Sequence, residues 1–200
     1  MRRISVILIP VLLTLALLLG IALWRVSDTL PGLGRVVETG TAAIGAPFTL
    51  TDQNGRKRNS AEFHGRYMLI YFGYSYCPDV CPTTLALMGD ALDKLGPLRA
   101  RIVPIFITVD PERDTPAHLK TYLKAFGPDF VGLTGDVATI AKVAGAYRVY
   151  FKKHPLPGGG YGMDHSSVIY LMGPDGRFVT YWDDTAVGPD KLAEELRARL

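Results

Sequence analysis

Short apolar runs bounded by turn residues predict the strands of this chain. Two of these runs are almost wholly apolar and too short for free helices, so they predict central buried strands at residues 68–74 and 101–109. A strand from Phe48 runs into Asn54-Gly55, a strong hairpin signal, and should return near residues 56–59. A second hairpin is predicted where residues 166–172 and 177–182 flank a Gly-Pro-Asp-Gly turn.

Apolar residues at helical spacing predict four helices between and after these strands, at residues 83–95, 115–126, 136–147 and 189–200. Residues 152–162, which include three consecutive glycines, predict a loop. Strands alternating with helices, followed by an antiparallel hairpin and a last helix, indicate an α/β class. This order is that of a thioredoxin-like domain with a mixed central sheet.

The N-terminal segment differs from the rest because Ile4–Trp24 contains no charge. As a helix, at about 1.5 Å per residue, it would be roughly 31 Å long, which matches a bilayer core. We therefore predict a transmembrane anchor over residues 1–24, a stalk over 25–43 and the thioredoxin-like domain over 44–200. A cleaved signal peptide is the alternative, with a weak cleavage site at Gly20 and Ala22.

The charge distribution predicts the topology and excludes one class of partner. Arg2 and Arg3 should stay in the cytoplasm, so the chain should be a single-pass inner-membrane protein with its domain in the periplasm, or in the mitochondrial intermembrane space of a eukaryote. All nineteen acidic and twenty of the basic residues follow Trp24, which leaves a net charge of only +1 there. No basic stripe is present, so nucleic acid is not an expected partner.

The chain has only two cysteines, Cys77 and Cys81. They directly follow a predicted central strand and lie one helical turn apart, so their sulfurs can approach each other at a helix start that favours thiolate. A disulfide here would close a very small loop and add little to stability, which favours a chemical role over an inert disulfide. The pair can form a redox-active disulfide or bind a soft metal ion.

The spacing of the pair separates several kinds of site. Thioredoxin-type enzymes have two residues between their cysteines, and this chain has three. Haem attachment needs Cys-x-x-Cys-His, which is absent, and a closed zinc site needs four good ligands from a chain with two cysteines and four histidines. Copper fits best, as Cu(I) with Cu(II) left open, because two thiolates and one imidazole suit this soft ion.

His165 is the predicted third metal ligand. It lies at the entrance to the predicted strand 166–172, which a thioredoxin-like fold places opposite the thiol-bearing helix. Asp164 is a candidate to orient its imidazole. His154 and Met163 remain minor alternatives as ligands, whereas His64 is interpreted as a turn residue and His118 as solvated.

Two polar segments lie near the cysteines in the predicted fold. One lies between the cysteines, and the other follows the second buried strand. Asp79, between the cysteines, has two equal interpretations: a residue that tunes the site, or a solvated loop carboxylate. The stretch after residue 109 is interpreted as a structural turn near the site but outside it, in which Asp114 or Thr115 caps the next helix.

Taken together, four motifs make the chain resemble the Sco/SenC family of copper-binding assembly factors for cytochrome c oxidase. The likeness covers about residues 44–200 and rests, in order, on Tyr71–Pro82, Thr108–Pro116, Phe126–Gly135 and Asp164–Ser166. The ligand positions match the family pattern, whereas the loop Pro157–Gly162 departs from it.

The resemblance implies a function for this thiol pair. It implies copper held by Cys77, Cys81 and His165, delivery to the copper A centre in cytochrome c oxidase subunit II, and exchange with periplasmic copper carriers or thioredoxin-like reductases. A binding protein of this kind is a metallochaperone rather than an enzyme. The alternative is a thiol-disulfide oxidoreductase that reduces the oxidase cysteines or serves redox sensing; a peroxidase has little support, because both cysteines lie on one turn.

Overall fold

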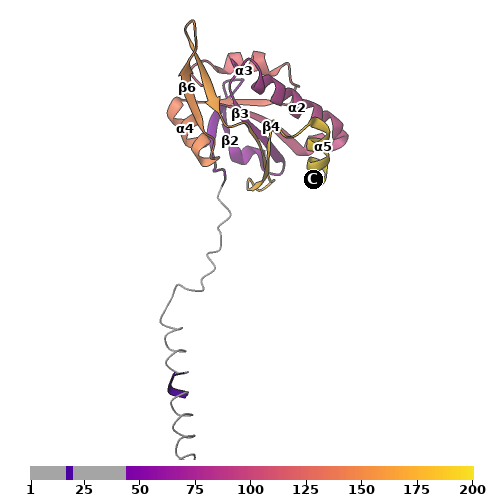
Figure 1. Cartoon of the computed structure of the whole chain (residues 1–200). Coiled ribbons are helices and arrows are strands. Elements are labelled where there is room, and N and C mark those ends of the chain that lie inside the picture. Colours follow the sequence, from indigo (N-terminus) through magenta and orange to yellow (C-terminus); the bar gives the residue numbers. More distant parts are fainter. Residues whose placement is uncertain (1–16, 20–43) are drawn as a thin grey trace, which may run out of the picture. The chain divides into compact units, whose positions relative to one another are not determined.

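The computed structural model describes residues 17–19 and 44–200, and the second range folds around a seven-stranded sheet (Figure 1). The strand order is β2-β1-β5-β4-β3-β8-β9. Strands β3, β4 and β5 are parallel, and the other neighbours are antiparallel, so the sheet is mixed as predicted. The strands are β1 (Thr49–Asp52), β2 (Lys57–Asn59), β3 (Tyr67–Gly73), β4 (Ile102–Thr108), β5 (Val131–Thr134), β8 (Val168–Met172) and β9 (Phe178–Asp183).

Helices cover both faces of this sheet. Side chains alternate between the faces of a strand, so Tyr71 and Phe72 of β3 point in opposite directions. Tyr71 reaches Cys81 in α2, whereas the ring of Phe72 lies 5.2 Å from that of Tyr147 at the end of α4. The helices are α2 (Val80–Lys94), α3 (Pro116–Leu123), α4 (Val137–Ala146) and α5 (Pro189–Arg197), with the short 3-10 turns η1 (Ser60–Phe63) and η2 (Gly96–Arg101).

Most predicted elements are confirmed, including both hairpins and all four helices. Pro104 lies inside the central strand β4, yet β5 pairs with β4 only from Ile105 onward. Pro104 therefore has a paired strand on one side only, β3, which suits a residue that cannot donate to a ladder.

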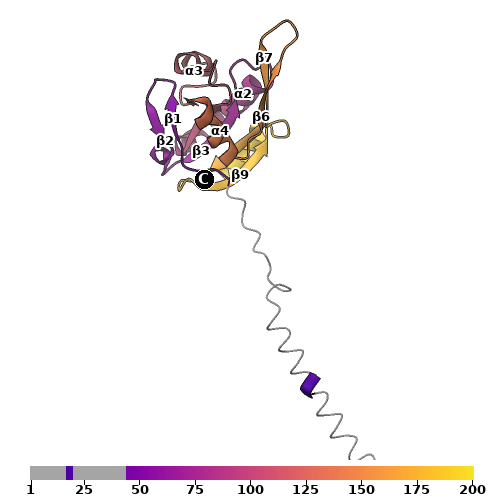
Figure 2. The same cartoon turned by 90° about the vertical axis from the view of Figure 1, so that its left-hand side faces the viewer.

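Two predictions for the chain between α3 and β8 are wrong. The short strand β5 was not expected; its four residues include Gly132, whose missing side chain lets Leu123 of α3 approach the sheet. The predicted loop at residues 152–162 is largely a two-stranded hairpin of β6 (Phe151–Pro155) and β7 (Tyr161–His165). This hairpin stands out from the body of the domain in both views (Figures 1 and 2). Its tip around Gly158–Gly160 is irregular.

The predicted anchor over residues 1–24 and stalk over 25–43 lie outside the described residues, apart from the helical residues 17–19. Among the helices of the described ranges, none has the length and apolar character needed to cross a membrane. Residues 44–200 lie within one compact unit.

Candidate metal centre

The two cysteines lie where the chain passes from strand β3 into helix α2. Cys81 is in the first turn of α2, and its backbone N–H points at the sulfur of Cys77, with 3.5 Å between N and Sγ. Asp79, the residue before the helix, makes no capping hydrogen bond through its side chain. The Cys77 sulfur therefore occupies the place of a helix cap, and the positive end of the helix favours negative charge on it.

Cys81 is completely buried, whereas Cys77 is half-buried, and both are free thiols. A Cβ on Gly73 would lie 3.0 Å from the Cys81 sulfur and from side-chain carbons of two buried aromatic residues. Only a glycine at this strand end lets the helix bring its thiol so close to the sheet. The hydroxyl of Tyr71 lies 3.9 Å from the same sulfur, on the sheet side.

His165, the last residue of β7, meets Cys81 across 84 positions of sequence. Its Nε2 lies 3.2 Å from the Cys81 sulfur, and its Nδ1 lies 3.0 Å from the carbonyl oxygen of Ser166. Because a carbonyl only accepts hydrogen bonds, Nδ1 carries the hydrogen and donates it. In the neutral ring this leaves the Nε2 lone pair facing the thiol, as a metal ligand requires.

Two tyrosines hold the imidazole from the sides. The rings of Tyr71 and Tyr74 meet the ring of His165 edge to face, with centroids 6.1 Å and 5.9 Å away. Such aromatic pairs contribute about 0.5–1.5 kcal/mol beyond their buried area. Both tyrosines belong to the motif around the cysteines, but a supporting role for them was not predicted.

The two thiols differ sharply in acidity. A hydrogen bond from Cys81, aided by His165 and by backbone N–H groups of Cys81 and Asp79, lowers the pKa of Cys77 well below its usual range, against the effect of partial burial. The hydrogen bond to Cys77 together with burial raises the pKa of Cys81. Cys77 is therefore the thiolate and nucleophile of the pair, and Cys81 keeps its proton.

Asp114 fixes the loop that carries Cys77, although it was predicted only as a possible helix cap. It is fully buried; Oδ2 accepts from the Ser75 backbone N–H at 3.1 Å and from the Thr108 hydroxyl at 2.6 Å, and Oδ1 accepts from the Ser75 hydroxyl. The cap of α3 is Thr115, whose hydroxyl accepts from the backbone N–H of His118. The polar stretch after β4 thus supports the cysteine loop from outside the site, as interpreted.

The remaining candidates lie away from the thiols or in other roles. Asp164 does not orient His165: its Oδ1 lies 3.1 Å from Nδ1 of His154, across the β6–β7 hairpin. Met163 is packed in the core. His118 is half-buried and stacks on Tyr76 at 5.0 Å, so its interpretation as a solvated residue is wrong. Asp79 and His64 are both exposed, and this exposure fits either interpretation of Asp79.

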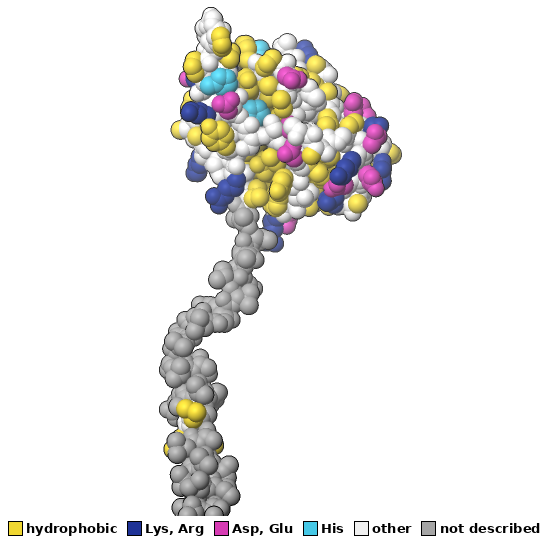
Figure 3. Space-filling model, viewed as in Figure 1, with side chains coloured by type: hydrophobic (Ala, Val, Ile, Leu, Met, Phe, Trp, Pro, Cys, Tyr) yellow, Lys and Arg dark blue, Asp and Glu magenta, His cyan; other side chains and the backbone are white. Residues whose placement is uncertain are grey.

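In the part of the chain that the structure describes, no group of three or more His, Cys, Asp and Glu side chains already converges as a metal site does. Cys81 and His165 are in contact, and Cys77 lies beside the first turn of α2. On the face drawn in Figure 3, histidines lie among hydrophobic side chains, and basic and acidic groups are interspersed.

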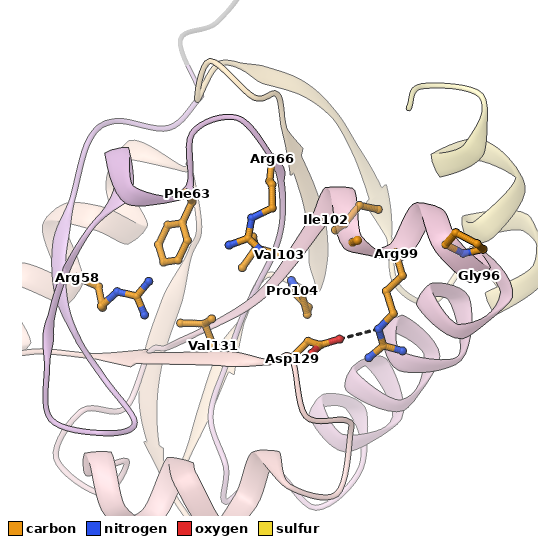
Figure 4. Close-up of a pocket in the computed structure, with 12 residues that line it drawn as sticks. Arg58, Phe63, Arg66, Gly96, Arg99, Ile102, Val103, Pro104, Asp129 and Val131 are labelled. Atoms are coloured by element: carbon orange, nitrogen blue, oxygen red, sulfur yellow. Dashed lines mark hydrogen bonds and ion pairs between the residues drawn. The ribbon is translucent and has the colours of Figure 1, made fainter.

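A pocket at the opposite end of the parallel strands is lined by three arginines (Figure 4). Two of them are already paired: Arg58 with Asp52 and Glu62, and Arg99 with Asp93 and Asp129. The third, Arg66, is exposed on the segment before β3. Neighbouring carboxylates therefore neutralise two of the three cations that line the pocket.

Comparison with known proteins identifies the family to which this chain is similar. The SCO1/SenC family model matches residues 36–200. The human mitochondrial protein SCO1 homolog is 38% identical over 164 residues, which are 80% of this chain and 53% of that protein, so the chain spans about half the length of this relative.

Two solved structures are similar as well. The copper-bound structure of Bradyrhizobium japonicum ScoI is 49% identical, has a TM-score of 0.73, and is matched over 79% of this chain and 100% of that one. BsSco, a Sco family cytochrome c oxidase assembly protein with a disulfide switch, is 25% identical with a TM-score of 0.63 over 78% and 91%. The family model matches most of the length of this chain, which carries the thiol pair on a thioredoxin-like domain. The chain therefore belongs to the SCO1/SenC family.

Proposed function

We propose that this protein is a copper metallochaperone that assists assembly of the copper A centre of cytochrome c oxidase. The observation that carries the proposal is the contact of Cys81 with His165 beside Cys77. These residues offer two sulfur donors and one imidazole nitrogen, a soft donor set that suits Cu(I). The copper-bound relative supports the same ion.

Each residue contributes a different property to copper uptake. Cys77 is the half-buried thiolate that an incoming ion meets first, and Cys81 is the buried thiol that must give up its proton on binding. His165 presents Nε2, because its Nδ1 hydrogen is held by the Ser166 carbonyl. Bound copper is the cargo in this role.

The decisive experiment is copper titration of the domain and of a His165→Ala variant. We expect one Cu per domain for the wild-type protein, with sulfur-to-copper charge transfer when Cu(II) is added. The variant should lose roughly 10-fold or more in affinity and show a changed spectrum. His118→Ala, which removes a histidine outside the thiol pair, is the matched control. Unchanged affinity and spectrum in His165→Ala would exclude the three-ligand site.

A thiol-disulfide oxidoreductase is the second candidate. Its specific support is the unequal pair, a low-pKa Cys77 beside a buried Cys81 thiol, together with the disulfide switch of the relative BsSco. This function needs both cysteines but not His165. Full rescue of oxidase assembly by His165→Ala, and none by Cys81→Ser, would favour reduction of oxidase cysteines over copper delivery.

The proposed setting follows from the sequence of residues 1–43. An uncharged segment at Ile4–Trp24 would tether the domain to the inner membrane, with the copper site in the periplasm or the intermembrane space. Cytochrome c oxidase subunit II is the proposed recipient. Fractionation of the full chain, with protease protection of the domain in intact cells or mitoplasts, tests this topology.

A further inference from the structure

Asp184 is a buried carboxylate beneath the thiol pair that copper binding does not use. It follows strand β9 and has only 8% of its surface exposed. Its backbone N–H donates to the carbonyl oxygen of Ser167, two residues after His165, at 3.3 Å. The residue therefore joins the end of β9 to the segment that carries the imidazole.

The carboxylate also contacts the two other elements of the site. Its Oδ2 accepts from the hydroxyl of Thr84, one turn after Cys81 in α2, at 2.6 Å, and from the hydroxyl of Tyr71 in β3 at 3.3 Å. Its other oxygen, Oδ1, is buried without a hydrogen-bond partner among the described residues. Burial raises the pKa of Asp184, and both hydroxyl contacts act in the opposite direction.

Tyr71 has a single hydroxyl hydrogen and two acceptors within reach. One is the Asp184 carboxylate at 3.3 Å, and the other is the Cys81 sulfur at 3.9 Å. A carboxylate is much the stronger acceptor, because hydrogen bonds to ionised groups are roughly twice as strong as neutral ones. The hydrogen therefore goes to Asp184, and the tyrosine offers the thiol only its oxygen.

We propose that Asp184 is a positioning residue for Cys81, acting through Tyr71: it holds the Tyr71 hydroxyl hydrogen away from the sulfur. This inference rests on the thiol chemistry of the proposed function, not on copper binding. Without the carboxylate, the hydrogen turns to Cys81 and strengthens the hydrogen bond that the Cys81 thiol donates to the Cys77 thiolate, which stabilises the reduced pair. The disulfide contains no such hydrogen bond and gains less. Asp184 thus keeps the pair more reducing than it would otherwise be.

The reaction that measures this effect is exchange with glutathione. Two glutathione thiols join as one disulfide, the bond between Cys77 and Cys81 breaks, and their two electrons and two protons pass to the two cysteine sulfurs. All atoms come from the protein and glutathione. The measurement is made on metal-free protein, so its outcome is independent of whether the site binds copper.

The test compares Asp184→Ala, which removes the acceptor, with Asp183→Ala, its exposed neighbour, whose carboxylate bonds Thr185. We expect Asp184→Ala to shift the glutathione equilibrium about 10-fold toward the reduced protein, a potential about 30 mV higher, and Asp183→Ala to shift it less than about 2-fold. An unchanged equilibrium in folded Asp184→Ala would overturn the proposal.

Tyr71→Phe provides the second arm, because it removes the hydroxyl and keeps the ring. Its equilibrium is the reference for the double variant, because it has no hydroxyl hydrogen that could turn to Cys81. In the Tyr71→Phe background, Asp184→Ala should then have no further effect. A full shift in that background would show that the charge of Asp184 acts without Tyr71 and would overturn the positioning role. Loss of copper stoichiometry with these results intact would refute only the metallochaperone function.

Discussion

The two ends of the parallel strands differ in whether their polar side chains are already held in ion pairs. At the amino-terminal end, Arg58 and Arg99 each lie between two carboxylates. At the carboxyl-terminal end, the thiols of Cys77 and Cys81 face each other and an imidazole, and no carboxylate of the described residues is in direct contact with them. Both ends gather side chains from distant parts of the chain, but only one leaves donor atoms that a soft ion can use.

This difference shows that a hollow in the surface is not by itself a site. In the arginine pocket, Arg58 and Arg99 are already held in ion pairs, which a ligand of these two side chains would have to displace. At the thiol end, the groups that touch the thiols and the imidazole directly are uncharged, such as Gly73 and Tyr74, and they leave the sulfur and nitrogen lone pairs available. Substitutions at the two ends should therefore affect different properties.

Cys81→Ser should have the largest effect at the thiol end. It removes the sulfur that contacts His165 and replaces it with a harder oxygen donor, so Cu(I) binding should fall by more than about 100-fold. Competition with a Cu(I) chelator measures the loss. Retained tight binding would mean that Cys77 and His165 suffice, and the comparison between the two ends would fail.

Asp114→Ala should have the next largest effect, on stability. It leaves the Ser75 backbone N–H and the hydroxyls of Ser75 and Thr108 without their buried acceptor, at a cost of about 3 kcal/mol in the free energy of unfolding. Denaturant unfolding measures this cost. Glu112→Ala, which removes an exposed carboxylate nearby, is the control and should change stability by less than about 1 kcal/mol.

The reactivity of Cys77 should depend little on pH. Because its pKa is lowered in the folded protein, its thiolate persists as pH falls through neutrality and is lost only at the lowered pKa. Alkylation of Cys77 should change less than about 2-fold between roughly pH 6 and pH 8, whereas an ordinary thiol changes nearly 100-fold. Mass spectrometry of the labelled protein distinguishes Cys77 from the buried Cys81. A steep rise with pH would contradict the assigned thiolate.

Arg99→Ala should have the smallest effect and sharpens the comparison from the other end. Its two ion pairs are partly exposed, so their loss should lower the free energy of unfolding by about 0.2–1 kcal/mol, and less at high salt. Copper affinity and the reactivity of Cys77 should remain at wild-type values. A change in either would show that the two ends are coupled.

Much of this protein could be predicted from local patterns. Apolar runs predicted β3 and β4, Asn54-Gly55 predicted the first hairpin, and the position of two cysteines after a buried strand predicted where the chemistry lies. These signals are local because strand burial, turn geometry and helix starts each depend on a few neighbouring residues. The short strand β5 was not predicted, because four residues that include a glycine are too few to show the alternation of apolar and polar residues typical of a strand.

Long-range contacts could not be predicted in this way. The contact between Cys81 and His165 spans 84 positions, and that between Tyr71 and Asp184 spans 113. Nothing in the residues around Asp184 distinguishes it from its exposed neighbour Asp183. Residue types and local order therefore established the fold class and the thiol pair, whereas the choice of partner for each buried polar group came from packing, since a buried group bonds whatever the folded chain brings within reach.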